Sequence, residues 1–325
     1  MLRELLARRL VIVTGKGGVG KSTIATALAL LASRQKRTLL VELEAQRSIA
    51  RFFGKPPAGY EAAEVAPNLS LINITGPEAI RDYLQLIVPV GLLVEKITAH
   101  PLYRYFTEAA PGIKELLTFG KIWKLEDEKH RHRPLYDLIV VDGFPTGQAL
   151  NMFRSPIEVC ETLKVGPIAS KARHLVDLMR DAEKTAFLLA TLPEEMPVAE
   201  SIELYRTLTR DIRIAYAGIA VNAILPKRFR RENLGRGGEI QRAVGEAFRE
   251  IGAGDSHVVH AYRAAHEEMR WRLTHEHYLK RLASELPGPF LHLPFVFKSD
   301  GGGELVERIA AVMAGEIAVP LRAAR

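Results

Sequence analysis

One short segment near the amino terminus carries the residue types that grip a chain of phosphates. Residues 11–23 read VIVTGKGGVGKST and fit the pattern G-x-x-x-x-G-K-S/T. Glycines let the backbone curl so that successive N–H groups point at an anion, and the helix that follows adds the positive end of its dipole. The lysine can reach the β- and γ-phosphates, and the hydroxyl after it can bind Mg²⁺. The segment predicts a site for ATP or ADP with Mg²⁺, made of Gly15, Gly17, Gly18, Val19, Gly20, Lys21, Ser22 and Thr23.

The setting of this segment supports the prediction. An apolar, β-rich run, Leu10–Thr14, comes before it, and a helix-forming run, Lys21–Ser33, comes after it. Strand, loop and helix in that order are the context that a phosphate-binding loop requires. A glycine-rich turn without a ligand is the alternative, and this context disfavours it.

Carboxylates that could complete the chemistry end two further apolar runs. Asp142 closes the run YDLIVVD and could orient Mg²⁺ through a water, although a strand-end aspartate can also simply cap the next turn. Glu42 and Glu44 close the run TLLVELE, and one of them could orient the water that attacks the terminal phosphate. Residues two apart on a strand point the same way, so the pattern does not separate the two glutamates.

The elements that must position these residues alternate along the chain. Short strand candidates are separated by helix-like segments, and most of the strands are apolar throughout, as in parallel strands buried on both faces. This pattern predicts an α/β fold, a P-loop NTPase with a doubly wound, mostly parallel sheet. The strand candidates are Leu10–Thr14, Thr38–Glu42, Leu69–Thr75, Asp137–Asp142, Ala186–Thr191, Gly218–Asn222 and Phe290–Pro294.

Two helical stretches interrupt this alternation. Pro77–His132 is too long for one crossover and has helical periodicity, and Arg228–Glu285 is helical and charged, with no strong strand candidate. We expect both stretches to form one inserted helical subdomain, made of residues 77–133 and 227–285. The P-loop core would then consist of residues 1–76, 134–226 and 286–325.

Composition narrows the function classes. The chain has 325 residues and one cysteine, Cys160, so it can form neither an intramolecular disulfide nor a zinc or arsenite site built from several thiolates. Its net charge of +7 is scattered along the sequence, so we expect no nucleic-acid partner. The longest uncharged apolar run, Leu86–Val94, is too short to span a bilayer, and the start does not fit a signal peptide. We therefore expect a cytoplasmic protein, with peripheral association with a membrane left open.

With these residues placed, the sequence resembles the ArsA-type ATPases, a family that includes the ATPases that target tail-anchored proteins. The second lysine of the loop, Lys16, is the mark of the deviant Walker A group. Val41–Gly54 is similar to the family's switch I segment, Val140–Leu150 to its switch II segment, and Val221–Pro226 to a later landmark. The resemblance covers nearly the whole chain and implies ATP hydrolysis.

The resemblance also implies roles for single residues. Lys16 would act in trans on the nucleotide of a facing subunit, so the protein would dimerise with itself or with a paralogue. Asn222 would hydrogen-bond the adenine, and Glu44 would position the attacking water, although an aspartate followed by proline is usual there. The catalytic set would then be Lys16, Lys21, Glu44 and Asp142. Pro145, Thr146 and Gly147 would belong to the switch II loop, which responds to the γ-phosphate.

A client is suggested by the same resemblance. In the targeting relatives the helical insertion forms an apolar groove for a transmembrane helix, so a hydrophobic helix or a membrane protein is the candidate partner here. Ile80–Ile97 carries many aliphatic residues, and Tyr103, Tyr105 and Phe106 follow it, but these side chains could equally pack the subdomain's own core. Two functions stay open: an ATP-hydrolysing dimer that handles a hydrophobic client, and a weakly hydrolysing regulatory subunit that acts with a partner or a paralogue.

Overall fold

The computed structural model describes residues 1–43, 48–87, 112–228, 239–250, 255–297 and 301–317. Glu44 lies outside these residues, as do Tyr103, Tyr105 and Phe106. The predictions that depend on those four side chains therefore stay predictions.

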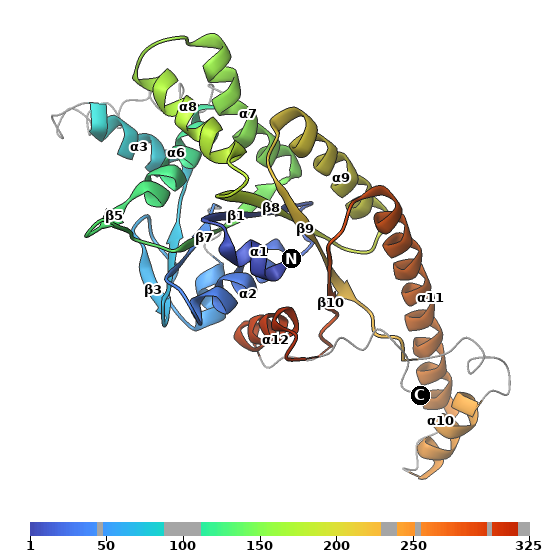
Figure 1. Ribbon diagram of the computed structural model, residues 1–325. Coiled ribbons are helices and arrows are strands. Elements are labelled where there is room, and N and C mark those ends of the chain that lie inside the picture. Colours follow the sequence, from blue (N-terminus) through green and yellow to red (C-terminus); the bar gives the residue numbers. More distant parts are fainter. Residues whose placement is uncertain (44–47, 88–111, 229–238, 251–254, 298–300, 318–325) are drawn as a thin grey trace, which may run out of the picture.

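One eight-stranded sheet forms the centre of the molecule (Figure 1). Its strand order is β10-β9-β8-β1-β7-β2-β4-β3, and all neighbours are parallel except β3 and β4. The predicted doubly wound, mostly parallel sheet is therefore confirmed; the short antiparallel edge strand β3 was not predicted. A separate hairpin pairs β5 with β6. The strands are β1 (Leu10–Gly15), β2 (Thr38–Glu42), β3 (Ala63–Ala66), β4 (Leu69–Asn73), β5 (Lys129–His130), β6 (Arg133–Pro134), β7 (Leu138–Pro145), β8 (Thr185–Thr191), β9 (Tyr216–Ile224) and β10 (Phe290–Pro294).

Helices cover both faces of the sheet, which explains why the strands are apolar throughout. In β1, Leu10 and Ile12 enter one core cluster, whereas Val11 and Val13 enter the other, and all four are fully buried. The second cluster is closed by α1 (Leu2–Ala7), α2 (Lys21–Ser33), η1 (Ile49–Phe53) and α12 (Gly302–Ala314). The first is closed by α6 (Ile113–Asp127), α7 (Thr146–Thr162), α8 (Pro167–Arg180), α9 (Glu195–Arg206) and η2 (Thr207–Ile212).

The remaining helices belong to the two stretches that interrupt the alternation. Helix α3 (Gly76–Ile87) packs against α6, which in turn packs against α7 and α8. Helix α10 (Glu239–Glu250) packs against α11 (Asp255–Glu285), which contacts α9 on another flank of the molecule (Figure 1). The assignment of residues 77–133 and 227–285 to one subdomain stays a prediction. No helix in the described part of the chain is long and apolar enough to cross a bilayer.

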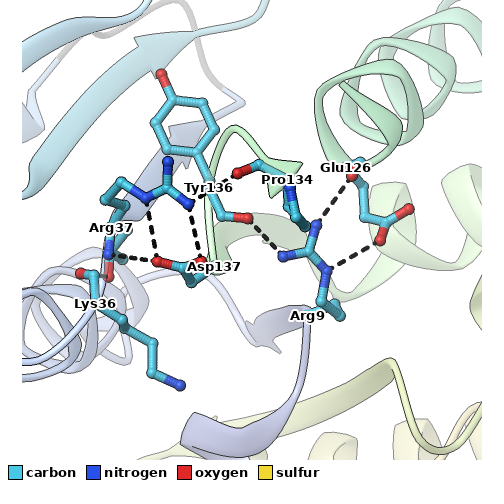
Figure 2. Close-up of polar contacts among 8 residues, drawn as sticks. Arg9, Lys36, Arg37, Glu126, Pro134, Tyr136 and Asp137 are labelled. Carbon is cyan, nitrogen blue, oxygen red and sulfur yellow. Dashed lines mark hydrogen bonds and ion pairs between the residues drawn. The ribbon is translucent and has the colours of Figure 1, made fainter. Parts of the chain in front are cut away.

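Two arginines fasten the amino-terminal edge of the sheet to the chain that returns from α6 (Figure 2). The Arg9 guanidinium donates to the Glu126 carboxylate at 3.2 Å, to the Glu126 carbonyl at 3.0 Å and to the Tyr136 carbonyl at 2.5 Å. Arg37 forks onto Asp137, with an Nη2 to Oδ1 distance of 3.1 Å, and holds the pKa of that carboxyl below its usual range. The helical stretch is thus anchored at the end of the sheet opposite the phosphate loop.

A close contact joins η1 to the start of α12. The carbonyl oxygen of Phe52 lies so near Gly303 that a Cβ there would come within 2.6 Å of it, and a Cβ on Gly302 would meet the Phe52 ring at 2.6 Å. Helix α12 can therefore approach η1 only because its first residues are glycines.

Candidate nucleotide site

The phosphate loop connects the end of β1 to the start of α2. Gly18 and Gly20 have φ angles of 84° and 88°, the left-handed region in which side chains are strained. Gly15 passes so close to β8 that a Cβ would come within 2.1 Å of the Ala190 carbonyl oxygen. Glycine is therefore required at all three positions. Val19 is buried and holds the tip of the loop against the core.

Asn222 meets the phosphate loop directly. Its side-chain amide, on β9, donates to the Val19 carbonyl oxygen at 3.0 Å. The same amide lies where a side chain on Gly20 would be, because a Cβ there would come within 2.3 Å of Asn222 Nδ2. A carboxamide also has an acceptor oxygen and a second N–H, which suit an adenine edge. The structure brings Asn222 to the loop, and its predicted contact with adenine stays a prediction.

The two loop lysines have different partners. Lys21 begins α2, and its ammonium donates to the Lys16 carbonyl oxygen at 3.2 Å, so it folds back over the loop. The Lys16 ammonium forms an ion pair with the Glu200 carboxylate of α9 in the same chain. Both side chains of that pair are about one-third exposed, at 31% and 29%. Glu200 lies 184 residues from Lys16, and no local sequence signal pointed to it.

The predicted magnesium ligands lie beside each other on neighbouring elements. Ser22 and Thr23 are half-buried in the first turn of α2, the turn whose N–H groups have no carbonyl partner within the helix. Asp142 is nearly buried on β7, paired in register with Val13 on β1 and with Glu42 on β2. A hydroxyl and a carboxylate at one edge of the sheet are oxygen donors of the kind that Mg²⁺ takes.

Glu42 has a structural partner that the sequence did not reveal. Its Oε1 accepts hydrogen bonds from the backbone N–H of Ser48 at 2.6 Å and of Ile49 at 3.2 Å, at the start of η1. Its Oε2 is buried and has no hydrogen-bond partner among the described residues. Glu42 thus caps the segment that follows the strand, and the choice between Glu42 and Glu44 as the water-positioning acid stays a prediction.

The three residues of the predicted γ-phosphate loop form the junction of β7 and α7. Pro145 ends β7 and is paired with Gly15, and Thr146 and Gly147 begin the 17-residue helix α7. The Thr146 hydroxyl is buried and has no hydrogen-bond partner among the described residues. A second helix start, with an unsatisfied hydroxyl, therefore lies at the same edge as the phosphate loop.

The site fits Mg²⁺ and a nucleotide on these grounds. The glycine-only curl, the starts of α2 and α7, the buried Thr146 hydroxyl and the Asp142 carboxylate lie at one edge of the sheet. Donor N–H groups and lysines match a polyphosphate, and the oxygen set matches a hard cation. Of the predicted site residues, only Glu44 falls outside the described residues.

Helix α11 holds the chain that follows Asn222. Arg272 donates to the Leu225 carbonyl oxygen at 2.9 Å, and the Leu225 N–H donates to His275 Nδ1 at 3.3 Å. Burial, with a smaller effect of the neighbouring Arg272 charge, lowers the pKa of His275 from 6.5 to about 4. A neutral His275 is what this geometry needs, since a protonated Nδ1 could not accept a hydrogen bond.

Comparison with known proteins gives the chain its relatives. The model of the anion-transporting ATPase family matches residues 8–179. ATPase BagA of Mycobacterium tuberculosis is 32% identical over 238 residues, which cover 71% of this chain and 69% of that protein. A putative arsenical pump-driving ATPase of Halobacterium salinarum is 29% identical over 67% of this chain and 35% of its own length. ATPase GET3B of Arabidopsis thaliana is 26% identical over 67% of this chain and 65% of its own length.

Proposed function

Since this chain belongs to the ArsA family of anion-transporting ATPases, we propose that it hydrolyses ATP with Mg²⁺ as a dimer in which Lys16 of each subunit acts on its partner's nucleotide. The resemblance and the ATPase class expected from the motifs are confirmed by the family match. The dimer, the magnesium requirement and the client are the parts that we propose.

One observation carries the proposal above the others. The starts of α2 and α7 lie at the carboxyl edge of adjacent strands β1 and β7, so two sets of helix N–H groups and their dipoles face one place. Asp142 stands between them on β7, paired in register with β1. Phosphoryl transfer needs this combination of positioned N–H donors and a carboxylate more than it needs a nucleophilic side chain.

Each residue of the site has a task in this reaction. The loop N–H groups and Lys21 would hold the β- and γ-phosphates and offset their charge, and the Ser22 hydroxyl and the Asp142 carboxylate would hold the metal. Bound Mg²⁺ would neutralise charge on the phosphate oxygens. Thr146 offers a hydroxyl to the γ-phosphate, and Glu44 orients the water in line with it. Asn222 keeps the loop in shape through Val19 and contacts the base.

Lys16 can act in trans only after its ammonium leaves the Glu200 carboxylate of its own chain. Its ammonium is paired with Glu200, so the pair must break before the lysine reaches a facing subunit. ATP bound to the partner would replace that carboxylate with phosphate oxygens, a stronger acceptor set for a lysine. The Glu200 pair therefore links dimer formation to the nucleotide state, whether the partner is a second copy or a paralogue.

The client part of the proposal concerns the helices beside the sheet. We propose that α3, α6, α7 and α8 handle a hydrophobic client, because an apolar cavity lies among them. The regulatory-subunit alternative would keep the nucleotide site but depend on a partner for turnover. The cytoplasm is the compartment we propose, with the client at or near a membrane.

Turnover by the purified protein tests the proposal. Lys21→Ala should abolish ATP binding in calorimetry, whereas Glu44→Gln should retain binding and lose turnover. Glu42→Gln serves as the matched control, because loss of the Glu42 charge should act on the cap at Ser48, and so on thermal stability, and not on turnover. Turnover that appears only after a partner protein is added would support the regulatory alternative, and retained turnover in Glu44→Gln would contradict the role of that acid.

A further inference from the structure

A hollow lies among four helices, apart from the nucleotide site. Helices α3, α6, α7 and α8 line an open cavity of about 560 Å³. Its walls are aliphatic and aromatic, and they include Ile80, Leu84, Leu116, Leu117, Trp123 and Leu175. A cavity of this size and lining is typical of a site for an apolar small molecule.

The charges at this cavity are mostly positive. Three lysines line it, Lys121, Lys124 and Lys171, against one acid, Asp82, among the described residues. Lys121 forms an ion pair with Asp82 at 3.2 Å, and the Tyr60 hydroxyl donates to the same carboxylate at 3.3 Å. Lys124 is farther from Asp82, at 3.8 Å, and its side chain is 48% exposed. An excess of ammonium groups beside an apolar wall suits a ligand with an anionic end.

Lys171 is held over the cavity by an aromatic ring. Its ammonium lies 4.8 Å from the centre of the Tyr83 ring, and both residues line the cavity. Two lysines on α6 and α8 thus lie near the apolar lining without a close carboxylate: Lys124, whose pair with Asp82 is long at 3.8 Å, and Lys171, which lies over the Tyr83 ring.

The edge of the cavity is exposed and apolar. Leu163 and Ile168 line it and are 41% and 42% exposed, and Val165 between them is 84% exposed. Lys164 lies in the same turn, and its carbonyl accepts a hydrogen bond from Arg173 at 3.0 Å. Apolar side chains among cations form the entrance that an anionic amphiphile would favour.

The charge at the cavity edge separates a fatty acid from a helix as the occupant. A helix is recognised by apolar anchors at spaced positions and needs no anionic end. The excess of lysines over acids at this cavity suits a ligand that carries an anionic end.

We propose that this cavity binds the hydrocarbon tail of a fatty acid, with Lys124 and Lys171 holding the carboxylate at its edge. The tail would replace water against Leu116, Leu117 and Trp123, and the head would meet the ammonium excess. A fatty acid would then be the hydrophobic client of the proposed function, so this inference rests on that function.

Calorimetry with soluble fatty acids tests this binding. Octanoate, decanoate and dodecanoate, each below its micelle concentration, should bind with one site, and each two-carbon extension should tighten binding roughly tenfold until the cavity is full. Decanol should bind more weakly than decanoate, and decyltrimethylammonium most weakly of the three. Equal binding of the three head groups, or no dependence on chain length, would overturn the proposal.

Gly120 offers a variant that should fold and fill the cavity. It lines the cavity on α6, and a Cβ there would meet no atom within 4 Å. Gly120→Leu should lower decanoate affinity at least tenfold, and Gly120→Ala, which gives the helix the same backbone benefit, should change it far less. Lys124→Gln with Lys171→Gln should lower decanoate affinity about tenfold and leave decanol unchanged. Undiminished decanoate binding in Gly120→Leu would overturn the assignment to this cavity.

Fluorescence places the ligand independently. The chain has two tryptophans, of which Trp123 lines the cavity and Trp271 is exposed on α11. In a Trp271→Phe background, decanoate should shift the emission of Trp123 to shorter wavelength, and an unchanged spectrum at saturation would contradict the site.

ATP turnover measured in the same preparation keeps two failures apart. Normal turnover without decanoate binding would overturn the fatty-acid site and spare the ATPase. Decanoate binding without turnover would do the reverse. Saturable binding of a hydrophobic helical peptide at Trp123, with none of decanoate, would favour a helix client and overturn the fatty-acid proposal.

Discussion

Replacing Glu200 with glutamine should make the protein dimerise more readily with ATP. The variant keeps the shape of the side chain but removes the charge that holds Lys16 in its own chain. A pair whose side chains are both about one-third exposed is worth at most about 1 kcal/mol. A symmetric dimer releases two such lysines, so the gain is about 2 kcal/mol, or about 30-fold in the dimer dissociation constant. A pairing with a paralogue would release one, a gain of about fivefold.

Sedimentation equilibrium with a non-hydrolysable ATP analogue and Mg²⁺ measures this change. Glu203→Gln is the matched control, because Glu203 is an exposed acid on the same helix and its loss should leave the constant unaltered. Without nucleotide, neither variant should dimerise. A dimer of Glu200→Gln that is equal to or weaker than the wild type would refute the reasoning, since Glu200 would then not restrain Lys16.

Three stability measurements probe the contacts that frame the site. Between pH 7.5 and 5.0 the wild type should lose about 2 kcal/mol of unfolding free energy through His275. The folded pKa of His275, about 4, lies below its unfolded pKa of 6.5, so the unfolded chain takes up the proton first as the pH falls. Urea titrations of His275→Asn should not show this loss of stability with pH. Gly303→Ala should cost about 1–3 kcal/mol, because its Cβ would crowd a carbonyl of η1. Gly301→Ala meets no atom within 4 Å and only weakens the N-cap of α12, so it should lower the melting temperature less. Arg9→Ala should cost about 1–3 kcal/mol, because it removes the partner of the Glu126 carboxylate, which is only 11% exposed. Adding Glu126→Gln should recover part of that loss in chemical denaturation. An undiminished stability of Arg9→Ala alone would contradict the anchoring role.

Local sequence patterns predicted the strands and helices that have a clear hydrophobic pattern, and the residues at which such a pattern ends. The apolar run Leu10–Thr14 and the helix Lys21–Ser33 have the bounds that their residues suggest, to within one residue. Asp142 was recognisable because an acid after a buried run has to lie near the carboxyl edge of the sheet. The edge strand Ala63–Ala66 was missed, since four residues of modest β-propensity leave no period to detect.

Partners that are distant in the sequence could not be predicted. Nothing near Lys16 indicates that Glu200 will meet it, because that meeting depends on how α9 crosses the end of β8. The Asn222 amide was expected to contact a base, and its bond to the Val19 carbonyl depends on the path of the phosphate loop past β8, which no local pattern gives. Glu42 and Glu44 were equivalent by alternation, and only the turn into η1 gave Glu42 its backbone partners.

The position of β1 in the sheet has a consequence for synthesis on the ribosome. Its two neighbours are β7 and β8, which the chain reaches only at residues 138–145 and 185–191. A nascent chain that has exposed its glycine curl therefore lacks the second of its two flanking strands until β8, at residues 185–191 of 325, has emerged. Nucleotide should not protect shorter nascent chains from protease, and protection should begin in a single step once β8 has cleared the exit tunnel.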